Sequence, residues 1–429
     1  MPVSVAEDLD RWLADHWDPE LGLREWRAVL VDSGWARPAW PGEWWGMGLP
    51  PADAAEAQRV LAEAEVVGPP STVAVNLVAP TILQHGSDLL RSTFLRPALV
   101  GDHAWTQLFS EPGAGSDLAG VTTRAERRAE LPGDTWIVNG HKVWNSGAQD
   151  ADHGLLLART DWDVPKHRGL TCLVVDMRAA GVHVRPLPQM NGYATFSEVV
   201  LTDVRVPAEH VLGEVGGGWA VVNAMLANER SLGAGAGTVP VPGNVAGRCR
   251  REAAEEAARA ARHFSWYPQR YGRADLVAAA RSADPLVRQQ IARVVTLARI
   301  AAWSAGRARA NLRLGRVAGA EGSLAKLMTS ELARAAAVAH AQLAGPDVLL
   351  GDTLTAEILL SVPAVSIAGG TDEIQKNIVA ERVLGLPKDP TSDAHVPFRD
   401  VRRNGPAEPS GAELSGAELS GAEPSGAGS

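Results

Sequence analysis

The pattern of apolar residues changes twice along the chain, and this change limits the folds open to it. Residues 1–105 and 218–388 carry apolar residues at helical spacing, whereas residues 106–217 hold short apolar runs of strand length. A block of strands between two helical blocks predicts an α+β multidomain protein. We therefore expect an N-terminal helical domain, a central β-sandwich or barrel domain and a C-terminal helical bundle with these boundaries.

An Asn-Gly pair lies within the central block, between two runs rich in apolar residues. The segment is Thr135–Trp144, TWIVNGHKVW. Asn-Gly between such runs is a strong short-range signal for a β-hairpin, because both residues tolerate the positive φ that the turn requires. We predict a hairpin that turns at Asn139–Gly140. Leu170–Met177 and Glu198–Val206 are predicted as further strands from their length and composition.

The last block, residues 389–429, ends in Ser-Gly-Ala-Glu-Leu repeats that contain no aromatic residue. So little apolar surface does not offset the conformational entropy lost on ordering. We predict that this tail is disordered and lies outside the catalytic fold. The last ordered helix is then the one over Asp372–Leu384, followed by the stop signals Gly385 and Pro387.

Composition argues against several classes of function. A formal net charge of −9 disfavours a nucleic-acid partner, which needs clustered Lys and Arg. Cys172 and Cys249 lack metal-ligand spacing and the histidines are scattered, so we assign no metal and expect two free thiols in a reducing compartment. The start of the sequence does not resemble a signal peptide, and no run approaches the ~18 apolar residues of a membrane helix. We expect a cytoplasmic protein with no membrane partner.

Gln107–Asp117, QLFSEPGAGSD, is the first segment that could contact a ligand. Gly113 and Gly115 let the backbone approach a ligand closely, and Ser110 and Ser116 supply hydroxyl groups. The segment is not a P-loop, because no Gly-Lys-Ser/Thr follows. It is not a dinucleotide-binding fingerprint either, because the third glycine and the later acidic residue are missing. Its chemistry alone leaves open a ligand contact or an ordinary polar loop.

Two further segments have the same ambiguity. Trp144–Ser146, WNS, could place an indole and a hydroxyl on the same side of a strand, although a Trp there can equally serve packing. Gly369–Asp372, GGTD, places two glycines before a helix, with Thr371 as its N-cap and Asp372 in its first turn. Such a helix start can hold a ligand or be a simple loop-to-helix junction.

Glu229 lies on an apolar helix face. Val222, Met225 and Leu226 follow helical spacing. Glu229 comes four residues after Met225 and three after Leu226, and so lies on the same face. Burial of a carboxylate is costly unless the group is paired or functional, and burial raises its pKa toward the range of a general base. The spacing leaves two alternatives open: a general base, or an ion pair with a neighbouring helix.

In their order, spacing and amino-acid sequence, these segments resemble the acyl-CoA dehydrogenase family. Ser110–Asp117 resembles its first signature, Trp144–Ser146 its Trp-x-Thr/Ser flavin contact, and Phe196–Val200 the end of its β domain. Gly369–Leu386, GGTDEIQKNIVAERVLGL, resembles its C-terminal signature. The resemblance covers residues 5–388. It implies FAD bound between the β domain and the C-terminal bundle, in a homodimer or homotetramer that shares its flavin sites.

The resemblance also implies roles for single residues. Ser110 would meet the pyrimidine edge of the flavin, Trp144 would cover the isoalloxazine, and the Ser146 hydroxyl would reach N5. Gln342 and Gly345 would hold the adenine half of FAD from a second subunit. The full set implied for FAD is Leu108, Phe109, Ser110, Gly115, Ser116, Trp144, Asn145, Ser146, Arg288, Gln342, Gly345, Thr371 and Glu373, and the set implied for the substrate is Ser116, Arg230, Gly369 and Gly370.

The sequence departs from the family pattern at two places. The usual catalytic glutamate immediately precedes the Gly-Thr of the C-terminal signature, and here that position is Gly369. Some members instead place the base on the helix after the β domain, directly before an arginine, and Glu229–Arg230 matches this alternative. The Phe-Gly pair next to the family's flavin-binding arginine is also missing, and Arg288 is the candidate in its place.

The implied reaction is the α,β-dehydrogenation of an acyl-CoA thioester. Glu229 would take a proton from Cα, Cβ would give a hydride to flavin N5, and the Gly369 N–H would stabilise the thioester oxygen. An electron-transfer flavoprotein is the implied acceptor. Because Gly369 lacks a carboxylate, two alternatives stay open: a non-catalytic or half-competent subunit of a heterotetramer, or an oxidase or monooxygenase that uses O2. The motifs do not identify the acyl group.

Overall fold

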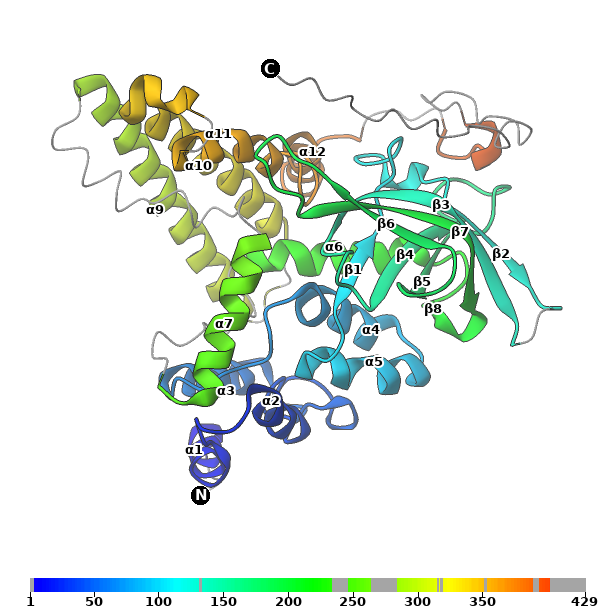
Figure 1. Ribbon diagram of the computed structural model, residues 1–429, viewed down its shortest axis with the longest axis horizontal. Helices are drawn as coiled ribbons and strands as arrows, with labels where there is room; N and C mark the ends of the chain where they lie inside the picture. Colours follow the sequence, from blue (N-terminus) through cyan, green and yellow to red (C-terminus); the bar gives the residue numbers. More distant parts are fainter. Residues whose placement is uncertain are drawn as a thin grey trace, which may run out of the picture.

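The computed structural model describes residues 4–130, 133–233, 246–263, 284–314, 316, 319–350, 353–388 and 393–401, without the side chains of 230–233, 260–263 and 312–313. Within these ranges the elements follow the order helices, strands, helices (Figure 1). The predicted α+β fold class is therefore confirmed.

The N-terminal domain is built from helices that surround a tryptophan-rich core. Trp26 is fully buried there, and its indole N–H donates to the Val67 carbonyl at 2.7 Å. Ser4 and Glu7 form a capping box that starts the first helix. The elements of this domain are α1 (Val5–His16), α2 (Leu23–Asp32), α3 (Pro51–Glu63), η2 (Ala74–Val78), α4 (Ala79–His85) and α5 (Asp88–Val100).

The central domain is one eight-stranded sheet in the order β6-β7-β3-β2-β4-β5-β8, with β1 paired in parallel to β4. Figure 1 shows β3, β6 and β7 lying over β4, β5 and β8. Apolar side chains from both layers, among them Val138, Leu173 and Val204, form one buried cluster between them. The strands are β1 (Trp105–Leu108), β2 (Arg124–Arg128), β3 (Thr135–Ser146), β4 (His153–Arg159), β5 (Leu170–Asp176), β6 (Val182–Leu187), β7 (Phe196–Pro207) and β8 (Val211–Leu212).

The hairpin predicted at Asn139–Gly140 is wrong. Thr135–Ser146 is one continuous strand that pairs with β7, and the Asn-Gly pair makes a bulge in its register. Asn139 donates from its side-chain amide to Asp203 at 3.0 Å, and a β-carbon at Gly140 would lie 2.3 Å from the Thr123 hydroxyl oxygen. Pairing over the whole strand therefore prevails over the local turn signal.

The C-terminal domain is a bundle whose long helices α9 and α10 pack on each other. Their shared core contains Ile291, Val294, Ala336 and Ile358. The helices are α6 (Gly218–Gly233), α7 (Arg248–His263), α9 (Pro285–Arg313), α10 (Glu321–Ala344), α11 (Leu354–Val365) and α12 (Asp372–Arg382). The predicted helices over this region are confirmed, whereas α11 was not predicted.

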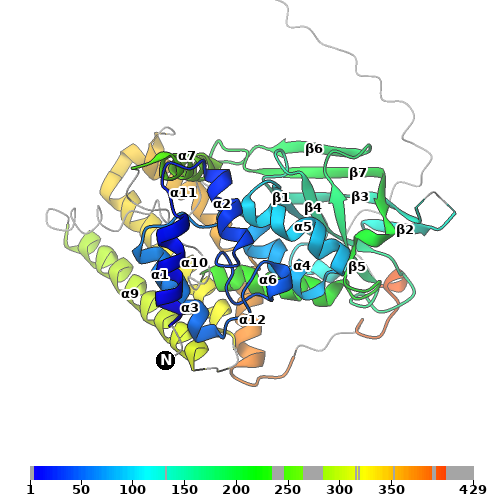
Figure 2. The ribbon, with the colours of Figure 1, turned by 90° about the horizontal axis from the view of Figure 1, so that it is seen from below.

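Helix α7 joins the C-terminal half of the chain to the N-terminal domain. Figures 1 and 2 both show α7 beside α2. The Arg27 guanidinium lies 2.8 Å from the Glu256 carboxylate, and Cys249 is buried in the N-terminal core. By these contacts α7 packs on the N-terminal domain, although it follows the sheet in the sequence.

The predicted start of the disordered tail, residue 389, needs a correction. Residues 393–401 lie against the central domain, and they include a short 3₁₀ helix, Phe398–Asp400. The Phe398 ring is 1% exposed, so one aromatic residue in this segment supplies the apolar surface that the composition of the repeats lacks. The repeats themselves lie outside the described residues.

Both cysteines are free and fully buried, as predicted for the thiols. Burial raises the pKa of the Cys172 thiol to about 12 and that of the Cys249 thiol to about 11. In the part of the chain that the structure describes, no group of three or more metal-binding side chains occurs. Among the same residues no single helix is long and apolar enough to span a membrane, and one bent pair, Glu321–Leu349 with Leu354–Val365, meets the criteria of length and composition.

Candidate functional site

The Ser110–Asp117 loop follows β1 and is tied to β3. The Val143 N–H donates to the Ser110 carbonyl at 2.9 Å, and Glu111 and Ala114 exchange backbone hydrogen bonds across a tight turn. Asp117 lies at the end of the loop and is exposed. The contact at Ser110 and the turn at Glu111–Ala114 hold the loop in a fixed position relative to the sheet.

A buried ion pair beneath this loop fixes its position. The fully buried Lys142 ammonium lies 2.8 Å from Glu111 and also donates to the Phe109 carbonyl at 3.0 Å. The Glu111 carboxylate accepts three more hydrogen bonds, from the N–H and hydroxyl of Thr122 and from the N–H of Thr123. Burial by itself would raise the pKa of Glu111, but Lys142 and these donors outweigh it and lower the pKa to about 2.

The loop offers a ligand its backbone and its serines rather than its large side chains. Leu108 and Phe109 are buried in two different apolar clusters, so only their backbone can contact a ligand. Gly113 and Gly115 are exposed, and a β-carbon at either would meet no atom within 4 Å. Ser116 is exposed as well. The surface around the glycines is therefore open to a bound molecule.

Trp144 has an unusual backbone conformation at the end of β3. Its φ is +63°, in the left-handed region that bulky residues avoid. Its side chain is 61% exposed and makes an edge contact with Phe196, at 5.9 Å between ring centroids. A large apolar ring held on the surface in a strained conformation is an observation that favours a function in ligand contact.

Asn145 and Ser146 complete this strand end. Asn145 is buried and donates from its side-chain amide to the Gln107 carbonyl at 2.7 Å, while its side-chain oxygen has no partner among the described residues. Ser146 is half-buried, and its carbonyl accepts from the Thr106 hydroxyl at 3.0 Å. The strand end thus lies directly beside β1. We call residues 107–117 and 144–146 the β-domain half of the site.

On the helical side, a turn with two positive-φ glycines leads into α12. Gly369 and Gly370 have φ values of +67° and +85°. The Thr371 side chain caps the helix by accepting from the Ile374 N–H at 3.3 Å, as predicted. The buried Gln375 amide donates to the Gly369 carbonyl at 2.8 Å and closes the turn.

Asp372 anchors this turn to α10. Its carboxylate lies 2.6 Å from the Lys326 ammonium and 2.7 Å from the Arg334 guanidinium. Burial would raise the pKa of Asp372, but these hydrogen-bonded cations lower it to about 2. The turn therefore has its own charge network, in which Asp372 is buried and Arg334 is exposed.

Glu229 on α6 faces the same turn. A β-carbon built at Gly369 would lie 3.4 Å from Oε1 of Glu229. Val222 and Met225 of the same helix are fully buried, whereas Glu229, predicted to lie within the apolar face, is half-buried and lies at its margin. The structure thus brings Glu229 to the side of Gly369, although 140 residues separate them in the sequence. We call Glu229 and residues 369–373 the helical half of the site.

Other residues assigned from the sequence lie on the surface. Arg288 on α9 and Gln342 near the end of α10 are exposed, Gly345 ends α10 with φ of +57°, and Glu373 is exposed in the first turn of α12. Among the described residues, no hydrogen bond or ion pair joins Arg288, Gln342 or Gly345 to either half of the site, and Glu373 belongs to the helical half by position alone. The side chain of Arg230 lies outside the described residues. The predictions for these residues therefore remain predictions.

Sequence reasoning missed the buried charges that support the site. No motif in the sequence marks Lys142, Lys326 or Arg334. The available signal was the position of Lys142 within a predicted strand segment, two residues before the predicted ligand contact Trp144. A lysine at that position needs a buried carboxylate, and Glu111 in the first signature was the candidate.

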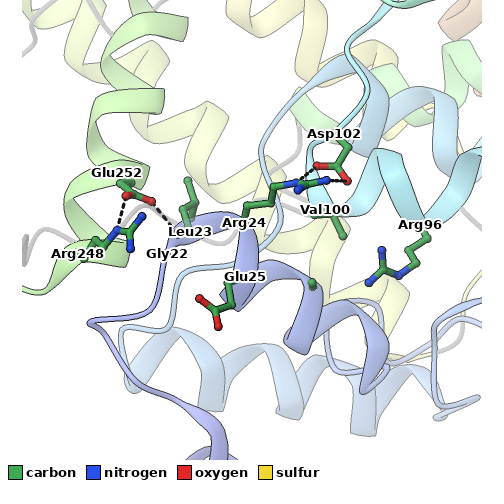
Figure 3. Close-up of a pocket in the computed structure, with 10 residues that line it drawn as sticks. Gly22, Leu23, Arg24, Glu25, Arg96, Val100, Asp102, Arg248 and Glu252 are labelled. Atoms are coloured by element: carbon green, nitrogen blue, oxygen red, sulfur yellow. Dashed lines mark hydrogen bonds and ion pairs between the residues drawn. The ribbon is translucent and has the colours of Figure 1, made fainter.

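A separate pocket of about 440 Å³ lies between α2, the end of α5 and α7 (Figure 3). Arg24 pairs there with Asp102 at 2.5 Å, and Arg248 pairs with Glu252 at 2.7 Å. No residue assigned from the sequence lines this pocket. Glu252 also joins α7 to the N-terminal domain, because it accepts from the Leu23 N–H at 2.8 Å, and we do not place the function in this pocket.

Two family models match the chain. "Acyl-CoA dehydrogenase, middle domain" matches residues 106–204, and "Acyl-CoA dehydrogenase, C-terminal domain" matches residues 216–384. Acyl-CoA dehydrogenase IpdE1 of Mycobacterium tuberculosis is 32% identical over 379 residues, which are 85% of this chain and 88% of that protein. Acyl-CoA dehydrogenase FadE34 of the same organism is 33% identical over 362 residues, and the match covers 84% of this chain but 46% of that longer protein.

Solved structures give the same result. The ChsE4-ChsE5 complex from Mycobacterium tuberculosis contains a chain that is 26% identical, with a TM-score of 0.59 over 90% of this chain and 97% of that one. A variant of the Tcur3481-Tcur3483 steroid ACAD is 25% identical, with a TM-score of 0.61 over 90% of this chain and 98% of that one. The fold, the family models and a relative matched over most of its length agree: the chain belongs to the acyl-CoA dehydrogenase family, whose members are FAD-binding oxidoreductases.

Proposed function

We propose that this chain catalyses the α,β-dehydrogenation of an acyl-CoA thioester with Glu229 as the base. The observation that carries the proposal is the distance of 3.4 Å between Oε1 of Glu229 and the β-carbon position at Gly369. Gly369 stands where the family's usual glutamate is expected. The Glu229 carboxylate on α6 therefore lies next to the position that a side chain at residue 369 would occupy, and we infer that it takes the place of the glutamate missing from the turn.

The residues of the β-domain half fit a bound FAD. The open space around Gly113 and Gly115 admits a ligand against the loop backbone, and the exposed Trp144 ring offers a flat apolar face. The unpartnered side-chain oxygen of Asn145 marks a polar atom at the same strand end that lacks a donor. When bound, FAD supplies the two-electron oxidant for the reaction. Ser110, Trp144 and Ser146 are the residues that would hold its ring system.

The chain's own groups handle the proton. Glu229 receives the Cα proton, and the Gly369 N–H donates to the thioester oxygen as negative charge develops there. The positive φ of Gly369 turns its peptide group away from the conformation that other residues prefer, which is a reason for glycine at this position. Contact with the flavin and substrate completes the exclusion of water from the half-buried carboxylate.

The test begins with the purified protein, its flavin content and a panel of acyl-CoAs. Because one of the similar solved structures is a steroid ACAD, the panel includes polycyclic as well as straight and branched acyl groups. Near-equimolar flavin and anaerobic bleaching by at least one thioester support the proposal. A flavin-loaded protein that no thioester bleaches contradicts it.

The role of Glu229 is tested by Glu229→Gln. Loss of a general base lowers kcat by about 10²- to 10⁴-fold, and FAD should stay bound because Glu229 is not in the β-domain half. Glu229→Gln combined with Gly369→Glu returns a carboxylate from the other side of the same space and should recover part of the lost rate. If Glu229→Gln turns over at the wild-type rate, Glu229 is not the base.

A second candidate is a subunit of a heteromeric acyl-CoA dehydrogenase. It is favoured by the glycine at position 369 and by the similar structure of a ChsE4-ChsE5 complex. Apolar side chains on the C-terminal bundle, such as Leu349 and Leu384, are 84% and 66% exposed and would suit a subunit interface. Sedimentation analysis separates a homodimer or homotetramer from a chain that needs a different partner.

The electron acceptor is a further part of the proposal. We expect an electron-transfer flavoprotein rather than O2. Turnover with such a flavoprotein, without matching peroxide formation in air, supports this acceptor. Stoichiometric peroxide would favour the oxidase alternative.

A further inference from the structure

We propose that residues 393–401, which we call the strap, position the Ser110–Asp117 loop and thereby set the affinity for the CoA part of the substrate. Figure 1 shows the strap, coloured red-orange, beside the central domain and apart from α12. The inference rests on the proposed function, because it takes Ser116 as a CoA contact. It adds a region that the motifs did not include.

The strap is anchored at Phe398. The ring is 1% exposed and lies under the Arg159 guanidinium, at 3.4 Å from the guanidinium carbon to the ring centroid. Its neighbours in the strap continue the contact through the backbone, because the Phe398 N–H donates to the Val164 carbonyl and the Arg399 N–H to the Trp162 carbonyl, both at 3.0 Å. The strap thus covers the loop between β4 and β5, residues 160–169.

Arg159 connects the strap to the segment that follows the Ser110–Asp117 loop. It is fully buried, and its guanidinium donates to the Ala119 carbonyl at 2.6 Å and the Val121 carbonyl at 3.1 Å. It also donates to the Lys166 carbonyl at 3.1 Å. One planar cation therefore holds three segments together, and the Phe398 ring covers its face.

Lys166 makes the second connection. Its ammonium lies 3.1 Å from Asp393 of the strap and 3.1 Å from Asp117, which directly follows Ser116. The Lys166 side chain is 17% exposed and Asp393 26%, whereas Asp117 is 63% exposed, so solvent screens the contact to the strap less than the contact to the loop. The strap carboxylate and the loop carboxylate thus share one cation.

The covered loop also touches the helix that carries Glu229. His167 makes an edge contact with Trp219 of α6, at 4.8 Å between ring centroids, and Leu170 forms a parallel bridge with Gly217. The direct connection through Lys166 ends at the loop that carries Ser116, whereas Glu229 lies ten residues further along α6 than Trp219. We therefore expect loss of the strap contacts to act on substrate affinity more than on the chemical step.

The experiment compares two strap variants with a matched control in the full chain. Asp393→Asn removes the strap carboxylate that contacts Lys166, and Phe398→Ala removes the ring that lies under Arg159. The control variant Asp400→Asn makes the same change of charge at an exposed position of the strap. Hydrogen exchange of the flavin-free protein is measured over residues 110–120 and 160–169. Steady-state kinetics with the thioester identified by the panel gives KM and kcat separately.

Both strap variants should exchange faster over the two segments and should raise the KM for the thioester by about 2- to 30-fold, the range of coupling through packed networks, with kcat within twofold of wild type. Asp400→Asn should match the wild type, and Phe398→Tyr should retain most of the affinity because it keeps the ring. Unchanged exchange over 110–120, or an unchanged KM, overturns the proposal. If the wild type bleaches with no thioester, the proposed function fails, and the exchange data still decide whether the strap positions the loop.

Discussion

The two halves of the site are built in different ways. The β-domain half takes its order from a sheet: Lys142 and Glu111 form a buried pair below the loop, and the Val143 N–H of β3 donates to the Ser110 carbonyl of the loop. The helical half consists of a glycine turn, a helix start and Glu229 from a separate helix, and its ion pairs through Asp372 are only partly buried. Its flanking surface carries exposed apolar residues such as Leu384.

This difference separates what must stay fixed from what can be exchanged. Rigid contacts for a cofactor need a backbone that is held from several sides, and the sheet with its buried pair provides this. A base needs only a carboxylate in the right space, and side chains from either the turn or α6 reach that space. Under the proposed function, the carboxylate can therefore come from the turn or from α6, whereas the loop that would contact the cofactor has to stay in place.

The largest expected effect follows from breaking the buried pair with Lys142→Met. Glu111 would be left as a buried charge with no cation, which costs about 3–5 kcal/mol in the free energy of unfolding. Urea unfolding followed by tryptophan fluorescence measures the change. Lys326→Met in the helical half should cost less, because Asp372 keeps Arg334 as a partner. Equal losses in the two variants would contradict the comparison.

Acidification gives a second way to sharpen the contrast. Glu111 and Asp372 both have pKa values lowered to about 2, from ordinary values of 4.5 and 3.8. A lowered pKa stabilises the folded state above the ordinary value, and this stability is lost as the pH falls toward 2. The wild type should therefore lose stability between about pH 4.5 and 2.

Two variants, Lys142→Met and Asp372→Asn, should show how much of the stability lost in acid comes from each half of the site. In Lys142→Met, protonation of Glu111 removes the unpaired charge, so the difference from wild type should shrink in acid. Asp372→Asn lacks the carboxyl group that titrates in the helical half. Its free energy of unfolding should therefore fall less than that of the wild type as the pH is lowered. Urea unfolding at a series of pH values provides both curves. A constant difference between Lys142→Met and wild type across this range would show that Glu111 does not control the loss.

The smallest expected effect concerns Trp144. Trp144→Gly relieves a left-handed backbone conformation, which should stabilise the flavin-free protein by up to about 1 kcal/mol. The same change removes the exposed ring, and the affinity for FAD should fall by about 2- to 12-fold, the range of an aromatic stacking contact. Thermal unfolding and a fluorescence titration with FAD measure the two effects. Trp144→Phe keeps an aromatic face and should retain most of the affinity for FAD. If Trp144→Gly lowers both the stability and the affinity for FAD, the backbone at Trp144 is not strained.

Much of the fold followed from local patterns in the sequence. Apolar spacing predicted helices such as α9, α10 and α12, because one buried face repeats along each of them. The start of α12 at Thr371 followed from capping chemistry, which involves only neighbouring residues. The link between Glu229 and the turn at Gly369 came from the family resemblance, because spacing on the helix alone left a general base and an ion pair as alternatives.

The rest depended on contacts between distant residues. Asn139–Gly140 has the local signal of a turn, but pairing with β7 across the sheet decides its conformation. The Glu111–Lys142 pair joins residues 31 positions apart, and nothing local requires a charge to be buried there. The strap has one apolar anchor, Phe398, whose partner Arg159 lies more than two hundred residues earlier. No pattern of spacing can reveal such a contact.

The two buried cysteines have a practical consequence. Cys172 and Cys249 are the only cysteines in the sequence, and burial raises the pKa of both thiols far above neutrality. Neither thiol should react with maleimide while the protein is folded. A single cysteine introduced at an exposed position, such as Asp400, can therefore carry a fluorescent label without first removing the native ones. A label on the strap and the native absorbance of a bound flavin would then report the distance between them in solution.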